Sequence, residues 1–135
     1  MRNKRADLWK RTALVTLETA KSFRDHPDSR SCVSRIYYAA YQAATAVCLA
    51  HGDADRFPSG RNNPSHEQLP DLVRNNGDLP LSARQEVSRI LRTLQRSRVD
   101  ADYRPGQTVD ASTVAGALLA VAKLFKILGI YDDER

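Results

Sequence analysis

The sequence predicts an all-α protein, an antiparallel four-helix bundle with one additional short helix. Apolar residues recur with a helical period in four long segments, and helix-capping and helix-stopping residues separate these segments. No segment alternates apolar and polar residues for long enough to predict a strand. The length of 135 residues fits one domain covering residues 1–135.

The first two long helices are predicted over residues 6–23 and 31–50. The first contains no Gly or Pro and ends near Pro27, after which Asp28 or the next residue can cap the second. The second ends at Gly52, because glycine adopts the left-handed conformation that commonly closes a helix.

The connection that follows is predicted to be a loop over residues 53–64, since it is rich in Gly, Asn, Pro and Asp. Ser65 and Gln68 have the spacing of a capping box, in which the two side chains bond reciprocally to backbone N–H groups. This pair predicts a short helix at about 66–74.

The last two long helices are predicted over residues 82–98 and 110–128. Ser82 and Gln85 repeat the capping-box spacing at the start of the first, and Asp110 can cap the second. The final helix keeps a helical period of apolar residues until a glycine stops it.

The second long helix has two apolar faces, which indicates packing on both sides. Six alanines lie between residues 39 and 50 and allow neighbouring backbones to approach closely. Two interpretations remain open: the helix is the central one of the bundle, or it forms the seam of a homodimer.

Charge and cysteine content limit the classes of function. The formal net charge is +5, from 21 Lys and Arg against 16 Asp and Glu, which suits a polyanionic partner without requiring one. No apolar run approaches the roughly 20 residues needed to span a bilayer, and no secretory signal is evident, so we expect a cytoplasmic protein. Cys32 and Cys48 would lie roughly 24 Å apart on one helix, which predicts two packed thiols, with no disulfide and no metal site. Nothing in the sequence predicts a cofactor.

Four of the arginines on the helix predicted over residues 82–98 fall into two groups. Arg89, Arg92 and Arg96 lie opposite the apolar face and form either a solvated surface or a strip that binds a polyanion. Arg98 lies on the apolar face, where an unpaired charge costs several kcal/mol. It either joins the helix end to the acidic loop that follows or points at a ligand phosphate.

Three motifs give the chain a resemblance to the HEPN superfamily. They are Tyr37-Tyr-Ala-Ala-Tyr41 in the second helix, Ser65-His66 before the short helix, and Arg98-Val-Asp-Ala-Asp-Tyr103 after the fourth. More narrowly, the chain looks like a small stand-alone subgroup with a YYAA helix and an Arg-x-x-Ala-Asp-Tyr signature. The resemblance implies a four- or five-helix bundle that dimerises and acts on RNA without metal, often as a toxin paired with a minimal nucleotidyltransferase antitoxin or in defence against phage.

The catalytic signature of active HEPN ribonucleases is an Arg followed four to six residues later by a His. Here the fifth residue after Arg98 is Tyr103, and the Arg-x4-His spacing occurs instead at Arg61 and His66 in the long connection. Two arrangements are therefore open: a pair made by Arg61 and His66, or a composite site in which His66 approaches Arg98, Asp102 and Tyr103.

The resemblance also suggests a role for each residue of the composite site. Arg98 would hold a phosphate, Asp102 would orient Arg98, Tyr103 would donate a hydrogen bond, and His66 would move a proton. Tyr103 is also a candidate site for nucleotide attachment by a partner transferase. The alternative function is a catalytically inactive HEPN module that binds a nucleotide or a protein partner.

Overall fold

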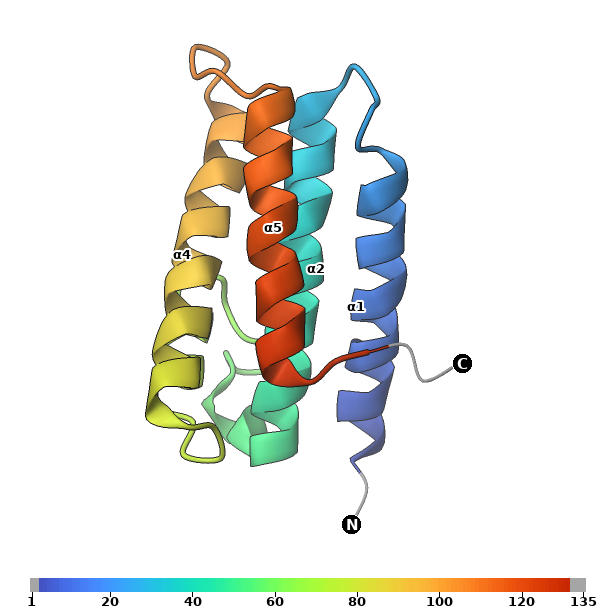
Figure 1. Cartoon of the computed structure of the whole chain (residues 1–135). Helices are drawn as coiled ribbons and strands as arrows, with labels where there is room; N and C mark the ends of the chain where they lie inside the picture. Colours follow the sequence, from blue (N-terminus) through green and yellow to red (C-terminus); the bar gives the residue numbers. More distant parts are fainter. Residues whose placement is uncertain (1–2, 132–135) are drawn as a thin grey trace.

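The computed structural model describes residues 3–131, and within them it contains helices, turns and loops but no strand. The four long helices run alternately up and down, as the sequence predicts for an antiparallel bundle (Figure 1). They are α1 (Lys4–Ser22), α2 (Ser29–His51), α4 (Leu81–Tyr103) and α5 (Ala111–Leu128). The short 3-10 helix η1 (Asp53–Arg56) and the short helix α3 (Leu69–Arg74) lie in the connection between α2 and α4.

Most predicted helix ends are confirmed by their caps. The Asp28 side chain accepts a backbone hydrogen bond at the start of α2, and Gly52 closes that helix with a φ of 96°. Asp110 forms a complete capping box at the start of α5, and Gly129 closes the helix with a φ of 67°. These ends follow from local chemistry, because an oxygen acceptor satisfies free N–H groups and glycine carries no Cβ to oppose a positive φ.

The end of α4 differs from the prediction. The helix continues to Tyr103, five residues beyond the predicted end at Arg98. No Gly or Pro interrupts the chain between the start of α4 and Pro105. In addition, the Arg30 side chain donates hydrogen bonds to backbone carbonyls at this helix end. The extra turn matters because it carries Asp102 and Tyr103.

The starts of α4 and α3 also differ. Ser82 does not cap α4, whose N-cap residue is Pro80 with no side-chain hydrogen bond. Ser65 and Gln68 do form reciprocal hydrogen bonds of 3.1 and 2.9 Å, but they enclose a turn, and the helix begins only at Leu69. Pro70 has no N–H to donate to the preceding turn, so the regular hydrogen-bond ladder cannot start at residue 66.

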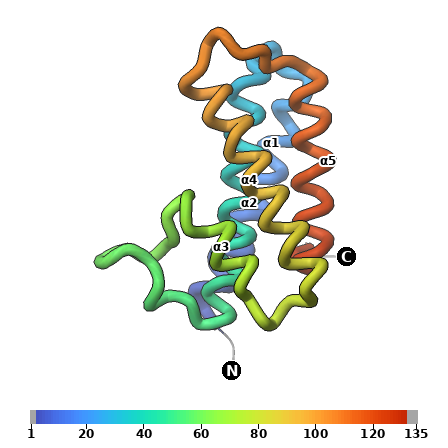
Figure 2. Tube along the Cα trace, turned by 90° about the vertical axis from the view of Figure 1, so that its left-hand side faces the viewer, coloured from blue at the N-terminus to red at the C-terminus, as the bar shows by residue number. Residues whose placement is uncertain are grey.

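Helix α2 is the central helix of the bundle. It packs against α1, α3, α4 and α5, and most of its side chains are buried, alanines on both faces included. Figure 2 shows the connection between α2 and α4 standing out beside the bundle, with α3 folded back against it. The interpretation of α2 as a central helix is therefore confirmed, while the homodimer stays a prediction.

The two cysteines and α5 answer two smaller expectations. Cys32 and Cys48 are buried and form no disulfide, and burial raises the pKa of both thiols, that of Cys48 to about 12.

Among the described residues, α5 is the one helix whose length and apolar composition would allow it to cross a membrane, and 28% of it is buried in the bundle. A core helix of a globular protein meets the same criteria, so this finding is weak evidence for a span.

Candidate functional site

Three tyrosines of α2 form the wall of the candidate site. Tyr37 and Tyr41 lie one turn apart and are buried, whereas Tyr38 is partly open to solvent at 36% exposure. The Tyr37 ring centroid lies 5.5 Å from that of Tyr38 and 6.3 Å from that of Tyr41. The three rings thus make a continuous aromatic surface on one side of the central helix.

His66 reaches this surface from the connection between α2 and α4. Its Nδ1 lies 2.7 Å from the Tyr37 hydroxyl oxygen, and its ring centroid lies 4.7 Å from that of Tyr41. The other ring nitrogen, Nε2, has no hydrogen-bond partner among residues 3–131. His66 is therefore oriented through one nitrogen while the second remains available for a ligand.

Tyr41 fixes the loop that carries His66. Its hydroxyl donates to the carbonyl oxygen of Pro64 at 2.6 Å and accepts from the side-chain amide of Asn63 at 2.7 Å. Two consecutive loop residues are thereby bound to one buried phenol, which places His66 against α2. Trp9 of α1 packs edge-on against the Tyr41 ring, with centroids 6.3 Å apart.

Arg98 enters the same surface from α4 and is 8% exposed. Its guanidinium carbon lies 5.6 Å from the Tyr37 ring centroid, 5.5 Å from that of Tyr38 and 5.7 Å from that of Tyr103. Ring faces attract a cation at these distances. The Nε group of Arg98 is buried without a hydrogen-bond partner, so its donor is unused.

Asp102 is the carboxylate nearest to Arg98. Its Oδ2 lies 3.9 Å from Arg98 Nη1, at the outer limit of an ion pair, and accepts a 3.2 Å hydrogen bond from the Ser34 hydroxyl. Arg98 and Asp102 share a face because four residues separate them on a continuous helix. The pair thus depends on the turn that α4 adds beyond its predicted end.

Arg30 at the start of α2 holds that last turn in place. Its guanidinium donates to five backbone carbonyls, those of Asp100, Ala101, Arg104, Pro105 and Gln107. Carbonyls at a helix C-terminus lack intrahelical partners and carry partial negative charge, so a guanidinium there stabilises the helix end. Arg30 could not be assigned this role from the sequence, since its partners lie about 70 residues away along the chain.

Burial and neighbouring charge set the protonation of the site. Burial, together with the positive charges of Arg98 and Arg61, lowers the pKa of His66 below its usual 6.5. Burial raises the pKa of the Tyr37 phenol well above its usual 10.0 and also raises that of Tyr41. At neutral pH the site therefore contains a neutral imidazole, protonated phenols and a cationic guanidinium.

The structure brings the four residues of the predicted composite site together. His66 and Arg98 both contact Tyr37 and Tyr38, while Asp102 and Tyr103 lie beside Arg98. Tyr103 is 69% exposed and forms the outer edge of the cluster.

The arginines of the predicted polyanion strip lie elsewhere, on the exposed side of α4. Arg89 pairs with Glu86 and Arg92 pairs with Asp71, each at 2.6 Å, while Arg96 lies 3.5 Å from a threonine hydroxyl. These three residues do not contact the composite site.

Sequence reasoning missed the tyrosines as site residues. Tyr37, Tyr38 and Tyr41 entered only as packing positions and as part of a family motif. Part of their signal was present in the spacing, because Tyr37 and Tyr41 are four residues apart and so lie on the same face of a helix, where a histidine and an arginine would both suit an aromatic wall.

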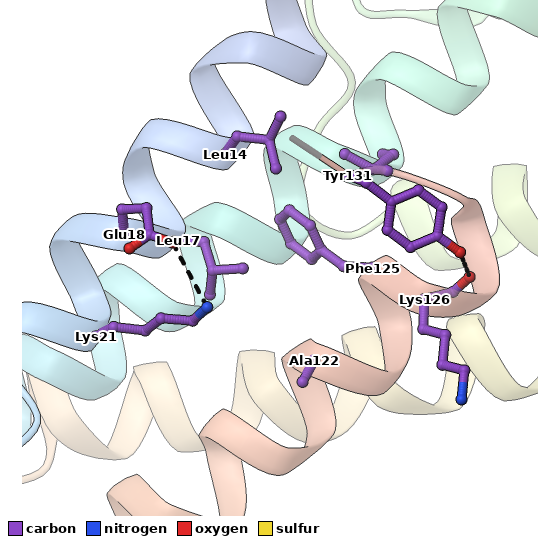
Figure 3. A pocket seen from close by; sticks show the side chains of 9 residues that line it. Leu14, Leu17, Glu18, Lys21, Ala122, Phe125, Lys126 and Tyr131 are labelled. Atoms are coloured by element: carbon purple, nitrogen blue, oxygen red, sulfur yellow. Dashed lines mark hydrogen bonds and ion pairs between the residues drawn. The ribbon is translucent and has the colours of Figure 1, made fainter. Parts of the chain in front are cut away.

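A separate pocket of about 480 Å³ lies between α1 and α5. The pocket is lined by Leu17, Phe125 and Tyr131 together with Glu18 and Lys21. Figure 3 shows the ion pair between Glu18 and Lys21 at its edge. None of the predicted site residues lines this pocket. Within residues 3–131 no group of three or more His, Cys, Asp and Glu side chains is arranged to hold a metal ion.

The similarity of the chain to known proteins is confined to one family. A family model described as the HEPN domain matches residues 6–131, which is nearly the whole chain. No curated protein and no solved structure matches. The helical bundle agrees with that family match, and we conclude that the chain belongs to the HEPN domain family.

Proposed function

We propose that this HEPN protein binds RNA and cleaves it without a metal ion, in a toxin–antitoxin or anti-phage defence setting. The observation that carries the proposal is the meeting of His66 and Arg98, 32 positions apart in the chain, at the Tyr37 and Tyr38 rings. A neutral imidazole beside a guanidinium supplies a proton acceptor and a phosphate ligand, the two groups that transesterification of RNA requires.

The proposed reaction uses the 2′-hydroxyl of the substrate as nucleophile. When His66 donates its Nδ1 proton to the Tyr37 oxygen, Nε2 has a free lone pair and takes the proton of the 2′-hydroxyl. The 2′-oxygen then forms a bond to phosphorus, and the bond from phosphorus to the 5′-oxygen breaks. The products are a 2′,3′-cyclic phosphate and a 5′-hydroxyl, whose proton comes from water.

Arg98, Asp102 and Tyr103 would stabilise the phosphate as it gains charge. The unused Nε donor of Arg98 suits a phosphate oxygen, and Asp102 orients the guanidinium from the next turn of α4. The substrate would reach Arg98 from the solvent side, where Tyr103 is exposed. The Tyr103 phenol then donates a hydrogen bond to the phosphate.

The partners follow from the same proposal. We place the chain in the HEPN subgroup with the YYAA helix and the Arg-x-x-Ala-Asp-Tyr signature, acting as a cytoplasmic homodimer. A minimal nucleotidyltransferase is the proposed antitoxin, and Tyr103 is the proposed site at which it attaches nucleotides. The high exposure of Tyr103 supports this role, because a modified phenol must be reachable by another enzyme.

A second candidate function is a catalytically inactive HEPN module that binds a nucleotide or a protein partner. Two observations favour it: Arg98 is almost enclosed by aromatic rings, and no histidine follows it within six residues. Under this alternative the guanidinium and the tyrosines bind a ligand, and no bond is broken.

Incubation of the purified protein with 5′-labelled tRNA and mRNA fragments in excess chelator separates the two candidates. We expect cleavage with cyclic phosphate ends, which Arg98→Ala and His66→Ala slow by about a hundredfold or more and Arg96→Ala preserves. RNA that is bound but never cut would favour the inactive module. Cleavage that survives both site variants would show that the active residues lie elsewhere.

A further inference from the structure

The positive charge of this protein is divided between surfaces that differ in how far carboxylates neutralise it. On the outer side of α4, Arg89 and Arg92 each form a 2.6 Å ion pair with a carboxylate. Glu86 binds Lys123 at 3.0 Å in addition to Arg89. A phosphate that approached this side would have to compete with carboxylates already in place.

Arg5 and Arg61, by contrast, are exposed cations without a carboxylate partner among residues 3–131. Arg61 lies in the connection between α2 and α4, and Arg5 lies in the first turn of α1. The Arg5 guanidinium donates to the carbonyl and side-chain oxygens of Asn62, at 3.3 and 3.5 Å. This contact brings a second cation to the residue directly after Arg61.

The loop that carries Arg61 is fixed to the candidate site. Asn63 and Pro64 both bond to the Tyr41 hydroxyl, and the Tyr41 ring lies 4.7 Å from that of His66. The positive charge of Arg61 contributes to lowering the pKa of His66 and acts in the same direction on Tyr41, which agrees with its position three residues before Pro64 in the same loop. The cations near the imidazole thus come from two parts of the chain, Arg98 from α4 and Arg61 from the loop, and Arg5 binds the loop residue next to Arg61.

We infer that Arg61 and Arg5 bind the backbone phosphates that neighbour the one held at Arg98. The bound strand runs from the end of α4 past His66 and along residues 58–66 to the start of α1. The ligand is therefore a polynucleotide with several consecutive phosphates rather than a single nucleotide, and Arg89, Arg92 and Arg96 do not contact it. This inference rests on the proposed function in taking RNA as the ligand, but not on cleavage.

The test is a binding measurement on a strand that cannot be cut. Fluorescence anisotropy would follow a labelled 2′-O-methyl RNA of about 12 nucleotides, a length within the usual range of single-strand sites. Wild type would be compared with Arg5→Gln/Arg61→Gln and with the matched control Arg89→Gln/Arg92→Gln, which removes the same number of charges. Each protein would be measured across about 50 to 200 mM salt, because phosphate contacts appear in the salt dependence.

We expect the loop-side double variant to bind about tenfold or more weakly, with a log–log salt slope smaller by about 0.7 for each lost phosphate contact. The control variant should bind within about twofold of wild type, as its charges are already paired. Arg61→Gln alone should show part of the loss with an unchanged melting temperature, because Arg61 makes no side-chain hydrogen bond in the described structure.

Equal weakening by both double variants, a larger effect of the control, or no binding by wild type would overturn the inference. Its failure can be told from that of the proposed cleavage. If wild type binds the methylated strand selectively through Arg61 but never cuts unmodified RNA, the inference stands and cleavage fails. If unmodified RNA is cut but the two double variants bind alike, cleavage stands and the inference fails.

Discussion

The inner and outer sides of α4 carry arginines in opposite situations. On the outer side, Arg89 and Arg92 are exposed and paired with carboxylates at 2.6 Å. On the inner side, Arg98 is almost buried, its nearest carboxylate lies 3.9 Å away, and three tyrosine rings surround it. The same residue type on one helix thus forms either a neutralised surface or an incompletely satisfied buried cation.

This difference shows which charges a ligand can use. An exposed ion pair contributes little to stability and offers little free charge. A buried guanidinium with an unused donor has lost water without gaining a full set of partners, which costs on the order of 1–3 kcal/mol and favours a ligand oxygen at that place. Substitutions on each side of α4 test whether the two sides differ in function as they do in structure.

The largest effect is expected from Arg98→Ala. Loss of the guanidinium removes the proposed phosphate ligand, and the rate of RNA cleavage should fall by about a thousandfold, the upper range for loss of one charge-stabilising donor. Gel assays of labelled RNA would measure the rate, with Arg96→Ala as the outer-side control. Equal losses in both variants would remove the distinction between the two sides.

The next largest effect is expected from His66→Ala, which should slow cleavage by about a hundredfold while leaving RNA affinity nearly unchanged. In wild type, the pKa of His66 lies below 6.5, so the base is neutral at pH 7 and becomes protonated as the pH falls through that lowered pKa. Cleavage should therefore be constant near neutrality and decline on the acid side. An acid limb centred above pH 6.5 would contradict the assignment of His66 as the base.

A smaller effect is expected from Tyr37→Phe. The substitution keeps the ring beneath Arg98 but removes the hydroxyl that lies 2.7 Å from His66 Nδ1. The free energy of unfolding should fall by about 1 kcal/mol, a typical value for one partly buried hydrogen bond. Urea denaturation would measure it. Tyr38→Phe is the matched control, since no hydrogen bond of the Tyr38 hydroxyl occurs in the described structure and its stability should not change.

The smallest effect is expected from Arg92→Ala on the outer side of α4. Its ion pair with Asp71 is exposed on both partners, so the free energy of unfolding should change by no more than about 0.5 kcal/mol. Cleavage should stay within about twofold of wild type. A large loss of RNA binding in this variant would instead indicate that Arg89, Arg92 and Arg96 form an RNA-binding surface.

The sequence predicts the parts of the fold that depend on local chemistry. The ends of α2 and α5 follow from glycines and a capping aspartate, and the inner position of Arg98 follows from the apolar period of its helix. The length of α4 does not, because its last turn depends on Arg30 of another helix. The predicted start of α3 at residue 66 was wrong. The capping box forms, but Pro70 lacks the N–H that a regular helix would need there, so the helix begins at Leu69.

Four residues of the candidate site were predicted, and their meeting was one of two arrangements left open, but the tyrosines that support them were not predicted. His66, Arg98, Asp102 and Tyr103 come from motifs, whereas their common support on the tyrosines of α2 arises from packing between distant segments. Hydrogen bonds such as that from Asn63 to Tyr41 fix the loop, and no local pattern encodes them.

The most direct test of the composite site is a double-mutant cycle on RNA cleavage. Rates would be measured in chelator for wild type, His66→Ala, Arg98→Ala and the double variant. If the two residues act on one scissile phosphate, the double variant should be hardly slower than the slower single variant, because groups that act as a unit are strongly non-additive. A joint site of His66 and Arg98 would be contradicted if the rate loss of the double variant equalled the product of the two single losses. It would also be contradicted if neither single variant lost activity.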